Sequence, residues 1–378
     1  MSSRAAAGPL WLAAPSRFAR LPSRKARWWA AGFVILLLAS LTAAIAPGPP
    51  PASHDPASAS TDRADVLLYQ HVAAGVRGGG NYYAVAAEAQ RREGYPVRPF
   101  VTMRLPTLAL IQAWLPAPLV FGLLWGLAAG TLYAWYLRLS AALTRPAPRL
   151  IGLGLVVLGG MICLWPDLIA FHEIWAGLLV ALSLALWRPG DWIAAVGVAA
   201  CAMLIRETAA LYAITMAGMA WASGDRREAR GWAAALAILA IAVAAHIYGW
   251  HQVVRPDDPD GPGWSALLGF GFFVKTITIL TGLIVFPPLL GAALVAFALI
   301  GWASWRDPLA VRVLAVTAAY AVIISLFCRT DTYYWGLMVA PVTLIGLVFA
   351  PDGLRDLWAS ATDKRRVIVT RTALGDGP

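Results

Sequence analysis

Apolar stretches close to twenty residues long recur along this chain of 378 residues. Folded as helices, such stretches are long enough to cross the roughly 30 Å of hydrocarbon in a bilayer. Only 13% of the residues are charged, whereas a soluble domain carries about 25%. Because so little polar surface is available to coat a water-soluble globule, the sequence predicts an all-α polytopic membrane protein.

We expect about ten transmembrane helices in a single transmembrane domain, residues 1–378. The predicted connections alternate in charge: one set, with both tails, holds 20 of the 30 Lys and Arg but only 8 of the 20 acidic residues. Cytoplasmic loops of membrane proteins are enriched in Lys and Arg. We therefore expect a multi-pass membrane protein with cytoplasmic tails at 1–27 and 351–378. The candidate spans are residues 28–46, 114–137, 150–165, 173–187, 192–205, 208–222, 231–250, 277–302, 311–328 and 334–350.

The formal net charge is +10. In a soluble protein this excess would indicate a nucleic-acid partner. Here it is explained by arginines that fix the topology of the spans, so we expect membrane lipids and no nucleic acid among the partners.

The longest non-cytoplasmic segment, residues 47–106, is predicted to be a periplasmic loop that carries surface helices. A linker rich in Pro, Ala and Ser leads into a stretch whose Val66, Leu67, Ala73 and Ala74 suit an amphipathic helix lying on the membrane. Three glycines at 78–80 end this helix, and the stretch NYYAVAAEAQRREG predicts a second one. Prolines then prevent a regular helix on the return to the bilayer.

Ionisable residues beyond this loop gather at the outer ends of helices or in outer loops. Such groups are costly at membrane depth and usually face a partner or a wet cavity. We therefore expect one polar cavity that opens outward beneath loop 47–106; the alternative is a set of interfacial residues with snorkelling side chains. The residues concerned are Asp167, His172, Glu173, Arg206, Glu207, Arg255, Lys275, Arg329 and Asp331.

Two acidic residues, Asp62 and Asp65, stand at the entry to the first surface helix. There an acid can interact with the helix dipole or serve as a general base. Arg98 and Arg104 flank the return into the bilayer, where a planar guanidinium suits a lipid phosphate or anchors the loop to headgroups.

Arg206 and Glu207 are adjacent in sequence between two short spans. Neighbouring residues on a helix do not face each other, so each is expected to find a partner on another helix, in a structural ion pair or in the cavity. Asp258 and Asp260 have the bare D-x-D spacing that holds a divalent metal in some transferases, and Mg²⁺ or Mn²⁺ is a possible cofactor. A solvated Pro/Gly-rich loop is the alternative that we favour.

A predicted first helix is followed by a long outer loop that contains ADVLLYQHVAAGVRGGGNYYAVAAEAQRREG. Further along the chain come FHEIWAGLLVALSLALW, IRETAALY and CRTDTYYWGLMVAPVTLIGL. This layout resembles bacterial members of the GT-C superfamily of glycosyltransferases. That superfamily includes protein O-mannosyltransferases, lipid A aminoarabinose transferases and polyprenyl-phosphate-mannose-dependent enzymes. The resemblance implies a hexosyltransferase of a bacterial inner (plasma) membrane, inverting at the sugar, with a lipid-linked sugar donor and a glycan, lipid or protein acceptor. A transporter or flippase of a polar or lipid-linked solute is the alternative.

The resemblance also implies roles for individual residues. Asp65, within Asp65-x-x-x-Tyr69, best matches the catalytic acid, and Asp62 is the second choice, although Arg63 and Ala64 separate two acids that are paired in many members. It leaves metal dependence open. The residues implied in substrate binding are Tyr69, Arg98, Arg104, His172, Glu173, Arg206, Glu207 and Arg329.

Overall fold

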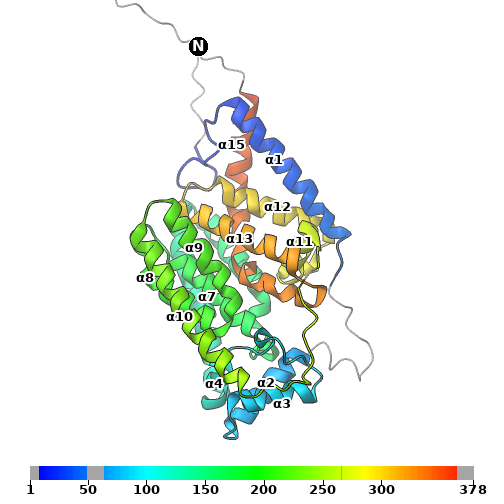
Figure 1. Ribbon diagram of the computed structural model, residues 1–378. Coiled ribbons are helices and arrows are strands. Elements are labelled where there is room, and N and C mark those ends of the chain that lie inside the picture. The colour runs from blue at the N-terminus through cyan, green and yellow to red at the C-terminus, as the bar shows by residue number, and fades with distance from the viewer. Residues whose placement is uncertain (1–7, 49–63, 265, 364–378) are drawn as a thin grey trace, which may run out of the picture.

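The computed structural model describes residues 8–48, 64–264 and 266–363, and in these ranges the chain is helical without a β-strand (Figure 1). The fold class predicted from the sequence is confirmed in this respect. The α-helices are α1 (Ser23–Leu41), α2 (Ala64–Arg77), α3 (Tyr82–Arg92), α4 (Thr107–Trp114), α5 (Ala117–Ala142), α6 (Pro146–Gly159), α7 (His172–Leu186), α8 (Ile193–Ile205), α9 (Ala210–Ala222), α10 (Arg226–His251), α11 (Gly269–Ile279), α12 (Pro288–Ser304), α13 (Pro308–Phe327), α14 (Ala340–Thr343) and α15 (Ala350–Thr362).

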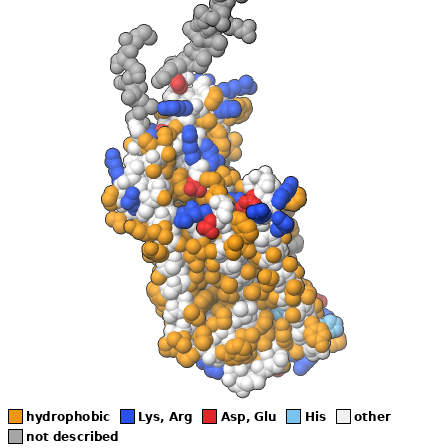
Figure 2. All heavy atoms as spheres, turned by 90° about the vertical axis from the view of Figure 1, so that its left-hand side faces the viewer, with side chains coloured by type: hydrophobic (Ala, Val, Ile, Leu, Met, Phe, Trp, Pro, Cys, Tyr) orange, Lys and Arg blue, Asp and Glu red, His pale blue; other side chains and the backbone are white. Residues whose placement is uncertain are grey.

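Four helices among the described residues are long and apolar enough to cross a membrane: α1, α5, α10 and α13. Shorter apolar helices, α6, α7, α8, α11 and α12, accompany them. Large apolar side chains stay exposed on the long helices, such as Ile35 on α1 at 66%. Figure 2 shows hydrophobic side chains over most of one face, with Lys and Arg gathered towards the end that bears α15. Because water would not tolerate this surface, the chain is a helical membrane protein.

Two predicted spans differ from single regular helices. The stretch 277–302 is divided between the end of α11, a 3₁₀ turn at Gly282–Val285, and α12, which begins at Pro288. A proline at the first turn of a helix removes no intrahelical hydrogen bond, so the Pro287-Pro288 pair starts α12. The stretch 334–350 is mostly 3₁₀, in η7 (Thr330–Met338) and η8 (Leu344–Val348), with only the short α14 between them.

The η8 segment packs against α12 through glycine. A Cβ atom added to Gly346 would lie 2.0 Å from the backbone oxygen of Ala298, and one added to Gly301 would lie 1.9 Å from that of Gly346. No larger side chain fits at either contact without moving a backbone. The two segments therefore approach at backbone distance, as small residues allow between membrane helices.

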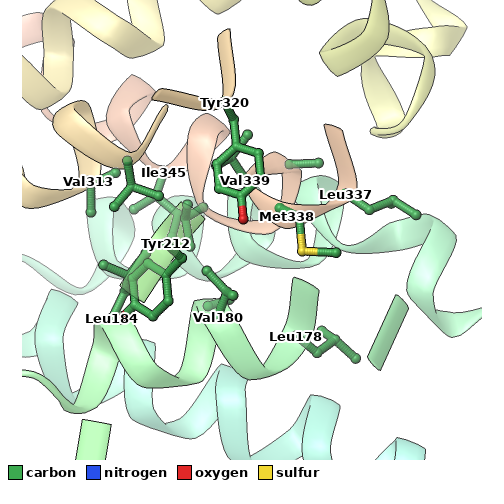
Figure 3. Close-up of a cluster of buried hydrophobic side chains, with 14 of the residues drawn as sticks. Leu178, Val180, Leu184, Tyr212, Val313, Tyr320, Leu337, Met338, Val339 and Ile345 are labelled. Carbon is green, nitrogen blue, oxygen red and sulfur yellow. The ribbon is translucent and has the colours of Figure 1, made fainter. Parts of the chain in front are cut away.

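The main hydrophobic core joins α7, α9 and α13 to η7 and η8 (Figure 3). Val180 and Leu184, one turn apart on α7, lie close to Tyr212 of α9 and are fully buried. The Tyr212 hydroxyl lies 2.7 Å from Ser183 Oγ, so this polar group is satisfied inside the core. The core lies between the two ends of the molecule and supports α7, whose first turn reaches the outer end.

A buried ion pair crosses the inner ends of these helices. Arg312 Nη2 of α13 lies 3.2 Å from Glu228 Oε2 of α10, and the indole N–H groups of Trp187 and Trp232 donate to Glu228 Oε1 at 2.8 and 3.1 Å. Both charged side chains are buried, so the pair neutralises two charges inside the protein.

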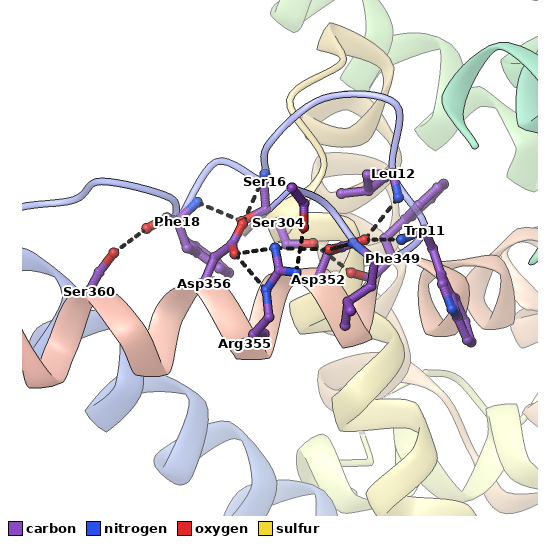
Figure 4. Close-up of polar contacts among 12 residues, drawn as sticks. Trp11, Leu12, Ser16, Phe18, Ser304, Phe349, Asp352, Arg355, Asp356 and Ser360 are labelled. Carbon is purple, nitrogen blue, oxygen red and sulfur yellow. Dashed lines mark hydrogen bonds and ion pairs between the residues drawn. The ribbon is translucent and has the colours of Figure 1, made fainter. Parts of the chain in front are cut away.

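The beginning of the described chain is fastened to α15 (Figure 4). The carboxylate of Asp352 accepts backbone N–H bonds from Leu10, Trp11 and Leu12 at 2.6 to 2.8 Å. Asp356 accepts from the backbone of Ser16 at 3.2 Å. Segments from the two ends of the sequence therefore lie side by side, at the end of the molecule opposite α2, α3 and α4 (Figure 1).

Two helices, α2 and α3, are present in loop 47–106 where the sequence predicted them, and together with α4 they form a lobe, called here the outer lobe. Its small core includes Leu68, Val72 and Ala87. Val66 and Ala73 are buried, whereas Leu67 remains exposed, so much of the apolar face of α2 packs on protein. The lobe lies at the lower end in Figure 1 and carries the N-terminal half of the candidate site.

Candidate functional site

A cavity of about 860 Å³ lies where the outer lobe meets η7 and the loop after α10. Asp65 and Tyr69 line it from α2, Arg104 from the return segment, and Arg329 from the start of η7. These four residues, predicted from sequence as site residues, therefore share one cavity although they come from three distant parts of the chain. The cavity is the geometric basis for any chemistry at this end of the molecule.

Asp65 occupies the first turn of α2, where the helix dipole favours a negative charge. Its Oδ1 accepts a hydrogen bond of 2.7 Å from the hydroxyl of Tyr95. Burial, followed by the neighbouring Asp65, raises the pKa of Tyr95 above its usual value, so the hydroxyl remains a donor at neutral pH. Tyr95 thus orients one oxygen of the carboxylate. Asp62, the second candidate for the acid, lies outside the described residues.

Arg104 is held from two sides. Its Nε donates to the Tyr69 hydroxyl at 3.0 Å, and the Tyr82 hydroxyl donates to its backbone oxygen at 2.5 Å. Its Nη2 lies 4.0 Å from Oε1 of Glu173. The guanidinium is thereby fixed at the wall of the cavity with a direction set before any ligand arrives.

Behind Arg104 lies an ion group made of the buried Glu173 and Arg206 and the half-buried Glu207. Arg206 Nε donates to Glu173 Oε1 at 2.5 Å, and Arg206 Nη1 also pairs with Glu207 Oε1. The expectation that Arg206 finds a partner on another helix is confirmed by Glu173 of α7, although Arg206 also pairs with its neighbour Glu207. Arg206 has an extended backbone at the break between α8 and the 3₁₀ turn Glu207–Ala209, so the rule for neighbours on a helix does not apply.

These three residues do not line the main cavity. Glu173 is 0% exposed and Arg206 is nearly as buried. They were predicted as substrate-binding residues; the structure instead places them where Glu173 faces both Arg206 and Arg104. Their geometry suits them to position Arg104.

His172 begins α7 and is also buried. Its ring meets that of Tyr69 edge-on, with 4.7 Å between centroids. It lines a separate hollow of about 20 Å³ with Tyr69, Arg104 and Gln90, which is room for one water molecule. His172 therefore supports Tyr69 from behind, away from the main cavity.

Arg98 does not line the cavity either. Its Nη2 lies 3.1 Å from Oδ2 of Asp260, and its backbone oxygen accepts from Gly261 at 2.6 Å. These contacts fasten the loop that follows α10 to the return segment. Arg98, predicted near a phosphate, therefore lies outside the cavity, and the arginine that lines it together with Arg104 is Arg329, which pairs with Asp331.

The D-x-D acids were expected in a solvated loop, and for Asp258 this was wrong. Its two oxygens accept from Arg91 Nε and Nη2 at 2.7 and 2.8 Å, and one also accepts from the backbone of Arg255 at 2.7 Å. Asp260 points elsewhere, to Arg98. In the part of the chain that the structure describes, no group of three or more His, Cys, Asp or Glu residues is arranged to hold a metal ion. The residues present therefore do not fit the Mg²⁺ or Mn²⁺ site considered from the sequence.

Sequence reasoning did not single out several residues of the cavity wall, including Tyr95, Tyr334 and Trp264. Tyr95 precedes Pro96 in an irregular segment, where no periodicity reveals the direction of a side chain. The chain matches no protein-family model, no curated protein and no solved structure. The cavity and its residues are the basis of the function proposed below.

Proposed function

We propose that this protein is a membrane glycosyltransferase of the GT-C type. It moves a hexose from a polyprenyl-phosphate donor to an acceptor hydroxyl on the periplasmic side of a bacterial inner membrane. The proposal includes about ten passes through the membrane, with both termini in the cytoplasm. The observation that carries it is the convergence of the carboxylate of Asp65 with two arginines, Arg104 and Arg329, on one cavity, where Asp331 is the partner of Arg329.

The position of the cavity supports this orientation. The outer lobe lies opposite the end that bears α15 and the start of α1 (Figure 1). Lys and Arg gather towards that other end in Figure 2. Since excess Lys and Arg mark the cytoplasmic side, the lobe and its cavity belong on the periplasmic side.

The charges of the cavity suit a displacement at the anomeric carbon. Asp65 accepts the proton of the acceptor hydroxyl while the acceptor oxygen forms a bond to the anomeric carbon. The bond between that carbon and the phosphate oxygen breaks, and polyprenyl phosphate leaves with the bonding electrons. A single displacement of this kind inverts the configuration of the sugar. A positioned general base contributes about 10²–10⁴-fold to such a rate.

Arg104 and Arg329 stabilise the negative charge that grows on the phosphate. Donors that are fixed before the reaction are the most effective, because they need no rearrangement in the transition state. Arg104 meets this requirement through its hydrogen bond to Tyr69 and its ion pair with Glu173. Arg329 is less enclosed, with Asp331 as its partner, and can adjust to the donor.

The test uses the purified chain in proteoliposomes with polyprenyl-phosphate hexoses labelled in the sugar and a bacterial membrane extract as the source of acceptor. We expect transfer of label to the acceptor fraction, and its loss in Asp65→Asn at unchanged protein abundance. Full activity of Asp65→Asn would remove this residue from the mechanism. Label that crosses the vesicle membrane without transfer would replace the proposal by the transporter or flippase alternative.

A further inference from the structure

The loop that follows α10 supplies a wall of the cavity to which the proposed chemistry assigns no role. Asp258 is fixed by Arg91, and Asp260 by Arg98. The backbone N–H of Gly261 donates to the carbonyl of Arg98 at 2.6 Å. Because residues 258–261 are anchored in this way, residues 261–264 are placed against the cavity, and all four of them line it.

Trp264 is the large side chain of this wall. It is 44% exposed although it borders a cavity. Other aromatic residues of the cavity are engaged with one another: the rings of Tyr69 and Phe171 are 6.4 Å apart, and those of Phe171 and Tyr334 are 5.0 Å apart. Within the described residues, the indole of Trp264 stacks on no other ring. Its face is therefore free to receive a ligand.

We propose that Trp264 is the platform on which the pyranose ring of a substrate stacks. A pyranose has one face covered by C–H groups, which carry a small positive charge. The face of an indole is negative and apolar, so it attracts such a surface and excludes water from it. Asp65, Arg104 and Arg329 recognise charge and protons, whereas Trp264 recognises the ring itself. This inference rests on the proposed function, because it deepens the account of the same cavity.

The experiment measures binding, so its outcome is independent of turnover. The probes are a polyprenyl-phosphate hexose, the same polyprenyl phosphate without sugar, and a short-chain alkyl hexopyranoside that resembles an acceptor. Each is titrated against the detergent-solubilised full chain. The ratio of the first two affinities isolates the contribution of the donor sugar. Trp264→Ala removes the platform, and Trp264→Phe keeps a smaller aromatic face.

Trp114 provides a matched control. It lies at the end of α4, is 77% exposed, and does not line the cavity. We expect Trp264→Ala to weaken binding of the sugar-bearing probe by roughly 3- to 10-fold, Trp264→Phe to retain most of it, and Trp114→Ala to match the wild type. An effect on the donor ratio assigns the platform to the donor sugar, and an effect on the alkyl pyranoside alone assigns it to the acceptor.

Several results would overturn the inference: equal binding by wild type and Trp264→Ala for all probes, equal loss in Trp264→Phe and Trp264→Ala, or equal loss in Trp114→Ala. Failure of the proposed function is recognised separately. If sugar binding depends on Trp264 but no transfer occurs in proteoliposomes, the stacking platform stands and the catalytic role falls. If transfer depends on Asp65 but Trp264→Ala binds the sugar probes as the wild type does, the catalytic role stands and the stacking platform falls.

Discussion

Arg206 donates from Nε to Oε1 of Glu173 across 2.5 Å, and both side chains are buried. We predict that Arg206→Met destabilises the protein by about 3–5 kcal/mol, because a buried carboxylate then loses its closest counter-charge. Thermal unfolding in detergent measures the change. Replacing both residues by apolar ones, in Glu173→Leu with Arg206→Met, should recover part of the loss. Wild-type stability of Arg206→Met would show that the ion pair contributes nothing.

The hydrogen bond from Tyr95 to Asp65 predicts a positioning role. Tyr95→Phe removes the donor that fixes one carboxylate oxygen, so we expect turnover to fall about tenfold with the KM for the donor lipid nearly unchanged. The matched control is Tyr133→Phe, on the exposed surface of α5. The turnover and KM of both variants are measured from sugar transfer in proteoliposomes. Equal turnover in Tyr95→Phe and Tyr133→Phe would exclude a positioning role for Tyr95.

The pairing of Asp258 with Arg91 predicts a pH-dependent attachment of the loop after α10. The hydrogen bond from Arg91 holds the pKa of Asp258 below its ordinary value of 3.8. The attachment is therefore complete above that value and is lost as pH falls through the lowered pKa. At neutral pH, Asp258→Asn should mimic the acid state.

Hydrogen exchange measures this attachment at the amides of Arg255 and Gly261, which donate to Asp258 and Arg98. We expect exchange about tenfold faster in Asp258→Asn. Asp257→Asn serves as the control, because Asp257 is exposed and the hydrogen bonds from Arg91 and Arg255 go to Asp258 instead. Equal protection in wild type and Asp258→Asn would contradict the prediction.

The contact of η8 with α12 predicts an intolerance of side chains. Gly346→Ala places a methyl group against the backbone of Ala298, and we expect a loss of about 1–3 kcal/mol or more from overpacking. Gly126→Ala on α5 is the control, since nothing lies within 4 Å of the added atom. Melting temperatures of the two variants should differ by several degrees. Equal melting temperatures would show that η8 and α12 move apart to accept the methyl group at little energetic cost.

Parts of the site could be predicted because they depend on position along the chain. Glycines at 78–80 and the prolines of the return segment delimit α2 and α3. A polar cavity was expected beneath loop 47–106, and Asp65, Arg104, Arg329 and Asp331 line one, whereas the other ionisable residues expected in it, Glu173 and Arg206 among them, do not. The helix boundaries follow from the local effect of helix-breaking residues, and the placement of the charged residues follows from the helix dipole and the cost of charge in a membrane.

Other parts depend on which side chain meets which, and no local rule determines that. Arg98 and Arg104 are alike in sequence context, yet one holds Asp260 and the other faces the cavity. Asp258 is buried only because Arg91, from a distant helix, reaches it. The break within 277–302 was also missed, since the run is apolar on both sides of Pro287 and its hydropathy shows no gap.

The position of α1 has a consequence for how the molecule is assembled. This helix packs on α11, α12 and α15, and the segment before it is bound by Asp352 and Asp356 of α15. During synthesis, α1 has none of these neighbours until residue 269 and beyond have been made. Its contacts with α11 and α12 can form only after α5 to α10 are complete, and its contacts with α15 later still. The packing of α1 is therefore a late, long-range event although the helix itself is made early.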